Sequence, residues 1–308
     1  MTAIGVDVGG TSLRICLSSS EGVSSPERRV WSGAGAQSPQ VLIEALRPYV
    51  DRAVRRHGGP VHLALGVAGQ VSADGVLVRN APNLGWRDVP LASLMMGALG
   101  SDVERVIVLN DLGAAALAEV QDGAAAGCSD ALLVFVGTGV GAAIVLGGEL
   151  QRGAGGFAGE LGHVKVRGND RPCGCGERGC VESLVGGRAL ERELIGLFGP
   201  CPQGLHPLEA WERMVEAGDT RATDLLHERA AVLGDVVAGA VTLLNPERVV
   251  LGGGVLFGMR RFRDLVVERV RGRALAVAAR DCAIVMAAHG DEAGVRGALV
   301  AARRARGT

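Results

Sequence analysis

Three cysteines and a histidine lie close together near the middle of this chain. Cys173, Cys175 and Cys180 fall within eight residues, and His163 precedes the first of them by ten. Thiolate and imidazole are the ligands of tetrahedral structural zinc sites. The spacing therefore predicts a Cys₃His zinc site whose four protein ligands leave no position for a reactive water. A redox pair formed by neighbouring cysteines is the alternative.

Glycines and two glutamates surround this cluster. Gly174, Gly176 and Gly179 interleave the cysteines, and we expect positive φ values there that turn the sulfur atoms toward one centre. Glu160 and Glu182 stand at the two ends of the segment. A zinc ion would hold these two carboxylates in a fixed relation, so that both face one ligand.

Two glycine-rich turns each follow an apolar run. Their residues are Gly9, Gly10 and Thr11 in "DVGGT", and Gly137, Thr138 and Gly139 in "VGTG". Backbone N–H groups without bulky side chains can approach a phosphate closely, so the turns predict phosphate binding, with plain hairpin turns as the alternative. Asp7 precedes the first turn, where it could hold Mg²⁺ through water or simply accept hydrogen bonds from the turn.

Polar residues follow a third apolar run, residues 104–109. Asn110 and Asp111 come directly after it and precede an alanine-rich helical segment. Side chains at the carboxyl end of a strand face the ligand crevice in α/β proteins, although Asp111 could equally be the helix N-cap. The loop "APNLGW" offers Asn83 to a hydroxylated ligand, unless Trp86 simply packs it.

These residues require strands and helices to position them. Short apolar runs ended by Gly, Asn or Asp predict strands at 3–8, 13–18, 61–68, 104–109, 132–136, 142–147, 248–252 and 283–287. Apolar residues at helical spacing predict helices at 40–56, 111–121, 183–197, 224–244, 261–271 and 292–304. The alternation indicates an α/β fold, and the repeated strand–turn–strand pattern indicates two related halves with the ligand in a cleft between them.

Composition excludes several classes of partner. The 308 residues carry 32 Lys and Arg against 33 Asp and Glu, so no overall charge favours nucleic acid or an anionic membrane. No apolar stretch approaches the ~20 residues that span a bilayer. The odd cysteine count and the absence of a leader-like start favour a cytoplasmic protein.

With these residues in view, the chain resembles the ROK family (repressors, uncharacterised frames and sugar kinases), and most of all its bacterial glucokinases. The resemblance covers nearly the whole sequence. It rests on "DVGGTSLR", "APNLGW", "LNDLGAAALAE", "VGTGVGAAIVLGGEL", "RGAGGFAGELGH", "CGCGERGCVE", "LNPERVVLGGGV" and "DEAGVRGALVAA".

The resemblance implies a two-domain, actin-like (ribonuclease-H-like) ATPase fold with a ligand cleft. We expect a small domain at residues 1–115, with a C-terminal helix at 292–308 packing back on it, and a large domain with the zinc loop at 116–291. It also implies assembly as a homodimer or homotetramer.

The implied activity is transfer of the γ-phosphoryl group of ATP, with Mg²⁺, to the 6-hydroxyl of glucose. Asp111 would be the catalytic base. The expected sugar ligands are Gly69, Asn83, Asn110, Glu160, His163 and Glu182, with His163 also binding zinc. Gly253 and Gly254 would let adenosine approach the backbone, beside the phosphate turns.

Alternatives to this activity concern the sugar, the donor and catalysis itself. The runner-up is a kinase for N-acetylmannosamine, fructose, mannose or allose, because Gln70 follows Gly69 where relatives vary. Leu112 and Gly113 replace the Ala-Asn found in many relatives. Polyphosphate is an alternative phosphoryl donor, which would require a more basic groove near the phosphate turns. A sugar-sensing transcriptional repressor is an alternative function, and repressors of this family usually carry an amino-terminal helix-turn-helix.

Overall fold

The computed structural model describes residues 1–31 and 38–305 and forms two compact units. The first comprises Met1–Gly127, Leu150–Ala158 and Ala288–Thr308, and the second comprises Cys128–Glu149 and Gly159–Ala287. The expected boundary between residues 115 and 116 falls inside a helix of the first unit, and the division into domains stays a prediction. The last three residues of the expected 292–308 segment lie outside the described residues.

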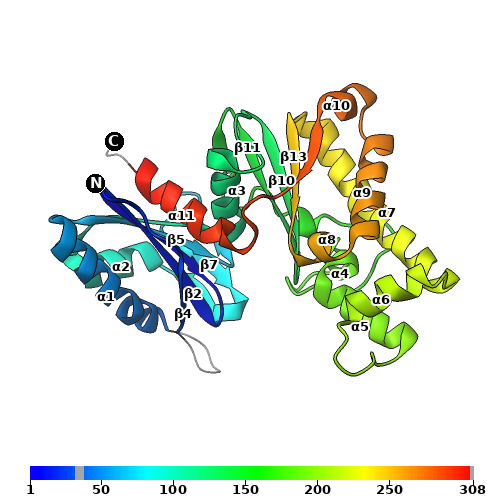
Figure 1. The fold of residues 1–308 in the computed structure, drawn as a ribbon, viewed down its shortest axis with the longest axis horizontal. Coiled ribbons are helices and arrows are strands. Elements are labelled where there is room, and N and C mark those ends of the chain that lie inside the picture. The colour runs from blue at the N-terminus through cyan, green and yellow to red at the C-terminus, as the bar shows by residue number, and fades with distance from the viewer. Residues whose placement is uncertain (32–37, 306–308) are drawn as a thin grey trace. The chain divides into compact units, whose positions relative to one another are not determined.

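The first unit is built on a mixed sheet of six strands in the order β3-β2-β1-β5-β9, with β4 beside β2 (Figure 1). β1 and β2 are antiparallel, whereas β1, β5 and β9 are parallel. Its elements are β1 (Thr2–Val8), β2 (Ser12–Ser19), β3 (Gly22–Val23), β4 (Glu27–Val30), α1 (Pro39–His57), β5 (Val61–Val67), β6 (Gln70–Val71), β7 (Val78–Ala81), η1 (Pro82–Leu84), β8 (Trp86–Val89), α2 (Leu91–Leu99), η2 (Gly100–Asp102), β9 (Val103–Asn110), α3 (Asp111–Asp122), η4 (Gly290–Glu292) and α11 (Ala293–Arg304).

Alternation along β1 explains how this sheet is covered on both faces. Ile4, Val6 and Val8 pack in one core cluster with residues of α1 and α2, because side chains two apart on a strand share a face. The opposite face is covered by α3 and α11. Gly5 lets α11 approach closely, since a Cβ there would lie 2.3 Å from the backbone nitrogen of Leu299.

The second unit repeats this sheet pattern. Its order is β12-β11-β10-β13-β14, again an antiparallel hairpin beside two further parallel strands. Its elements are β10 (Ala131–Val136), β11 (Val140–Leu146), β12 (Glu149–Gln151, which crosses the limit between the units), η3 (Leu161–His163), α4 (Glu182–Val185), α5 (Gly187–Phe198), α6 (Pro207–Glu216), α7 (Thr220–Leu244), β13 (Arg248–Gly252), α8 (Gly254–Gly258), α9 (Arg260–Arg273), α10 (Ala276–Asp281) and β14 (Ala283–Met286). The core gathers α7 and α9 against β10 and β13.

The expected α/β class is confirmed, but the sequence-based prediction lacks the helices α2, α6 and α10 and differs in two further features. The helix expected at 183–197 breaks at Gly186, whose φ of −65° and ψ of 144° are extended. The break frees the N–H of Gly187 to bond the carbonyl of Gly137 at 2.8 Å. A small sheet β6-β7-β8 was also not predicted, because its strands are short. None of the helices in the described ranges is long and apolar enough to cross a membrane.

Candidate functional site

Strand register brings three of the predicted site segments to one edge of the first sheet. Val8 of β1 pairs with Val67 of β5, and Val67 pairs with Asn110 of β9. All three strands run parallel, so the residues that follow them emerge at the same edge. Those residues are the Gly9–Thr11 turn, Gly69 and Asp111.

Asn110 and Asp111 have distinct positions at the start of α3. Asn110 is the N-cap, and its Oδ1 accepts the N–H groups of Leu112 at 2.9 Å and Gly113 at 3.2 Å. The alternative that Asp111 is the N-cap is therefore wrong. Asp111 is the first helical residue and is half-buried, and its Oδ1 accepts the N–H of Leu112 at 2.9 Å.

The loop after β7 lies against the first phosphate turn. A Cβ on Gly10 would lie 3.4 Å from the carbonyl oxygen of Asn83, so the loop and the turn are in van der Waals range. Asn83 is exposed, whereas Trp86 is buried. The loop is thus packed by its tryptophan and still offers the asparagine to a ligand.

Asp7 is paired with a cation beside the same turn. Arg14 donates to its Oδ2 at 3.1 Å and also approaches the exposed Asp291 at 3.5 Å. Burial raises the pKa of Asp7, although the charge of Arg14 opposes this shift. This carboxylate, 17% exposed, is therefore paired with Arg14 beside the first glycine-rich turn.

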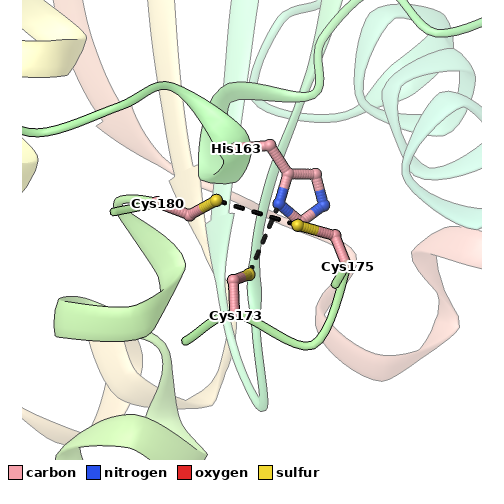
Figure 2. Close-up of side chains that lie close together, drawn as sticks. All are labelled: His163, Cys173, Cys175 and Cys180. Atoms are coloured by element: carbon pink, nitrogen blue, oxygen red, sulfur yellow. Dashed lines mark hydrogen bonds between the residues drawn. The ribbon is translucent and has the colours of Figure 1, made fainter. Parts of the chain in front are cut away.

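The cysteine cluster of the second unit converges on one point (Figure 2). The ligand atoms of His163, Cys173, Cys175 and Cys180 all lie within 4.8 Å of one another. Cys175 Sγ is 3.8 Å from Cys180 Sγ, and Cys173 Sγ is 3.7 Å from His163 Nδ1. Zinc bonds of about 2.3 Å in a tetrahedron place neighbouring ligand atoms about 3.8 Å apart, so this donor set fits zinc.

The loop that carries the cysteines uses fewer positive-φ glycines than predicted. Gly176 and Gly179 have φ values of 93° and 82°, whereas Gly174 is not in that region, so the prediction for Gly174 is wrong. The N–H of Gly176 bonds the carbonyl of Cys173 at 3.1 Å, and the N–H of Cys173 bonds the carbonyl of Glu177 at 2.8 Å, so both bonds close this turn. Lys165 adds a positive charge, with Nζ 3.3 Å from Cys180 Sγ.

Glu160 and Glu182 both lie beside this cluster. Glu160 Oε2 is 3.5 Å from Nε2 of His163, the ring nitrogen that does not face the sulfur atoms. Burial raises the pKa of Glu160, with the charge of His163 opposing the shift. Glu182 Oε1 lies 3.8 Å from Cys173 Sγ. The cluster therefore orients two carboxylates and one imidazole N–H site.

A pocket of about 630 Å³ adjoins the second glycine-rich turn. Of the glycine-rich residues predicted to bind nucleotide, Gly137, Thr138 and Gly254 line this pocket. Gly139 and Gly253 do not line it, because Gly139 faces Glu182 and Gly253 faces the backbone of Val136. Its polar walls come from Glu191, His206, Glu209 and Glu212. Sequence reasoning missed these four, because Glu191, Glu209 and Glu212 are polar positions on the amphipathic helices α5 and α6 and look like ordinary solvent-facing residues, and His206 is the N-cap of α6.

Two sheets of this topology, each with a glycine-rich turn in its hairpin, define the actin-like ATPase fold. Among solved structures, a ROK hexokinase from Thermus thermophilus aligns with a TM-score of 0.81 at 31% identity, over 97% of each chain. A ROK family glucokinase from Streptomyces griseus, solved with glucose and AMPPNP, aligns with a TM-score of 0.72 at 29% identity, over 99% of this chain and 100% of that one.

Curated relatives carry three different names. A glucokinase of Halalkalibacterium halodurans is 29% identical over 96% of this chain and 92% of its own. An N-acetylmannosamine kinase of Escherichia fergusonii is 33% identical over 83% and 84%. A xylose repressor of Caldicellulosiruptor bescii is 31% identical over 87% and 68%. Residues 3–305 match the ROK family as a whole, and the chain belongs to that family.

Proposed function

We propose that this protein is an ATP-dependent hexose kinase that phosphorylates the 6-hydroxyl of glucose. One observation carries the proposal: the carboxylate of Asp111 follows β9 at the sheet edge where the Gly9–Thr11 turn follows β1. Phosphoryl transfer needs little beyond alignment and charge neutralisation. A base and a phosphate-binding turn at the same edge of one sheet would provide the alignment.

Asp111 would act on the attacking group. Its carboxylate accepts the 6-hydroxyl proton as that oxygen bonds to the γ-phosphorus, and the bond from that phosphorus to the bridging oxygen breaks, releasing ADP with the electron pair. Such general-base assistance contributes about 10²–10⁴-fold in rate. The proposed ligands of the remaining sugar hydroxyls are Gly69, Asn83, Asn110, Glu160, His163 and Glu182.

The nucleotide would occupy the glycine-rich turns and the pocket beside the second one. The phosphate-binding residues are Gly9, Gly10, Thr11, Gly137, Thr138 and Gly139, with Gly253 and Gly254 near adenosine. Carboxylates line this pocket and its lining residues include no Lys or Arg, which favours the hydroxyls of a ribose over a polyphosphate chain. Asp7 would hold the Mg²⁺ that neutralises the transferred charge.

Zinc would be held by His163, Cys173, Cys175 and Cys180. His163 Nδ1 faces the sulfur of Cys173, and His163 Nε2 faces Glu160. Metal binding through Nδ1 would therefore fix the tautomer that carries its proton on Nε2 and can donate it in a hydrogen bond. The site is closed and structural in this account. We also propose a cytoplasmic homodimer or homotetramer, in line with the family resemblance.

A kinase for N-acetylmannosamine is the second candidate, favoured by the relative of that name. Gln70 directly follows Gly69, whose carbonyl oxygen accepts a hydrogen bond from Asn110. The side chain of Gln70 would therefore help to select among hexoses, including fructose, mannose and allose. A sugar-sensing regulator without catalysis is less favoured, because the base and both turns are retained.

The test is ADP release by the purified protein with Mg·ATP. Glucose, N-acetylmannosamine, N-acetylglucosamine, fructose, mannose and allose serve as acceptors, and polyphosphate replaces ATP in a parallel series. We expect the highest kcat/KM with glucose and ATP. A clear preference for N-acetylmannosamine would transfer the proposal to the second candidate, and silence with every sugar would favour a regulator.

A further inference from the structure

The carboxylate of Glu182 touches two different parts of the second unit. Its Oε2 accepts the backbone N–H of Val140 at 2.9 Å, and its Oε1 lies 3.8 Å from Cys173 Sγ. Val140 is the first residue of β11, directly after the Gly137–Gly139 turn. One side chain therefore links the cysteine cluster to the turn that lines the pocket.

The turn is shaped to accept this carboxylate. A Cβ on Gly139 would lie 2.3 Å from Glu182 Oε2, so the end of the Glu182 side chain would have to move, whereas a Cβ on Gly137 would meet nothing within 4 Å. The two glycines thus differ sharply in what they face, although they are two residues apart. Glycine at 139 is explained by the approach of Glu182.

The segment after Glu182 holds the same turn at two more points. The N–H of Gly187 bonds the carbonyl of Gly137 at 2.8 Å, and the N–H of Arg188 bonds the carbonyl of Thr138 at 3.1 Å. These bonds exist because the helix breaks at Gly186. The conformation of the turn consequently depends on where residues 182–188 lie, and that segment begins beside the cysteine cluster.

We propose that Glu182 couples the two substrates: it binds the sugar and also positions the phosphate turn for the nucleotide. This inference rests on the proposed kinase function. A sugar hydroxyl that donates to Glu182 restricts the carboxylate, which keeps Val140 and the turn in one conformation before ATP arrives. Coupling between ligands is reciprocal, so sugar and nucleotide each bind more tightly when the other is present.

The experiment measures binding by calorimetry, with glucose and Mg·AMPPNP added singly and together. Gly139→Ala forces Glu182 to move and leaves every proposed sugar ligand in the sequence. Gly196→Ala, on α5 and outside the proposed binding residues, adds the same methyl group where it meets no atom within 4 Å. We expect glucose alone to bind about 5-fold or more weakly to Gly139→Ala and normally to Gly196→Ala. Equal glucose affinities in the wild type and both variants would overturn the proposal.

A second arm uses no sugar and covers the case in which Gly139→Ala does not fold. Glu182→Asp shortens the side chain by one methylene and withdraws the carboxylate from Val140. We expect Mg·AMPPNP alone to bind about 5-fold or more weakly, an effect that a purely sugar-binding glutamate would not produce. Unchanged nucleotide affinity would overturn the coupling while leaving the kinase proposal intact, and wild-type protein that binds no nucleotide would overturn both.

Discussion

Asn110 donates a hydrogen bond from Nδ2 to the carbonyl oxygen of Gly69 at 2.8 Å. The same side chain caps α3 through its Oδ1. One amide thereby fixes the turn after β5 and the start of the helix whose first residue is Asp111. The carbonyl of Gly69 and the carboxylate of Asp111 are held in a defined relation by this residue.

Two substitutions separate the roles of Asn110. Asn110→Ala removes the cap and the bond to Gly69, so it should lower the free energy of unfolding by about 1 kcal/mol and raise the sugar KM. Asn110→Ser keeps a capping oxygen but has no donor that reaches Gly69, so it should be nearly as stable as the wild type yet share the KM increase. Urea unfolding and steady-state kinetics measure the two effects. A sugar KM for Asn110→Ser equal to that of the wild type would show that the hydrogen bond from Asn110 to Gly69 has no role in sugar binding.

Glu193 is the buried centre of an ion-pair network in the second unit. Arg229 donates to both of its carboxylate oxygens, at 2.9 and 2.7 Å, and the side chains of Glu193 and Arg229 are only 10% and 4% exposed. Arg171, from the cysteine-bearing loop, bonds the same carboxylate. Glu193→Gln should therefore lower the free energy of unfolding, but by less than the roughly 3–5 kcal/mol of a wholly uncompensated buried charge, because Glu228 still pairs with Arg229 at 2.6 Å.

A matched control is available on the same helix. Glu191 has only a loose contact with His206 at 3.5 Å and is more exposed, so Glu191→Gln should change stability by less than about 1 kcal/mol. Equal effects of the two substitutions would contradict a special role for Glu193.

The Glu193 contribution should also depend on pH. Burial alone would raise the pKa of Glu193, but the hydrogen bonds from Arg229 and Arg171 outweigh it and hold the pKa at about 2, against an ordinary value of 4.5. The folded state thus binds this proton less readily than the unfolded state, so the stabilisation is complete above about pH 4.5 and is lost toward pH 2. The stability gap between wild type and Glu193→Gln should narrow across that window. A constant gap would argue against the pKa shift.

Metal content tests the cysteine cluster directly. The purified protein should contain roughly one zinc per chain. Cys180→Ala should lose the metal and unfold at a lower temperature, because the ligand shell is incomplete. Cys201→Ala serves as the control, since Cys201 is outside the cluster. Elemental analysis measures the zinc content of the three proteins. A wild type that contains no zinc, together with a Cys180→Ala variant that unfolds at the same temperature as the wild type, would exclude a structural zinc.

Local patterns in the sequence predict much of this arrangement. The apolar runs around Val8 and Val136 predict strands, and the spacing of Cys173, Cys175 and Cys180 predicts their convergence, because each signal depends on residues near one another in the chain. The strand register that places Asp111 beside the first turn follows from the order of parallel strands, which the α/β alternation suggests.

Long-range contacts leave no such signal. Nothing in the sequence links Glu182 to Val140, 42 residues away, or Arg229 to Glu193, 36 residues away. The helix break at Gly186 was missed because apolar residues continue at helical spacing through it, and only the bond from Gly187 to Gly137 accounts for the change of direction. These pairings depend on how elements pack, which local propensity does not determine.

The most direct test of the central claim compares ADP formation from Mg·ATP and glucose by the wild type and Asp111→Asn. Asp102→Asn serves as the control, because Asp102 is the last residue of η2 and its half-exposed side chain has only a loose contact with Arg47 at 3.8 Å. The account predicts turnover by wild type and control, and a loss of about 10²–10⁴-fold in kcat for Asp111→Asn with unchanged thermal unfolding. Undiminished turnover by Asp111→Asn would contradict the assignment of Asp111 as the base.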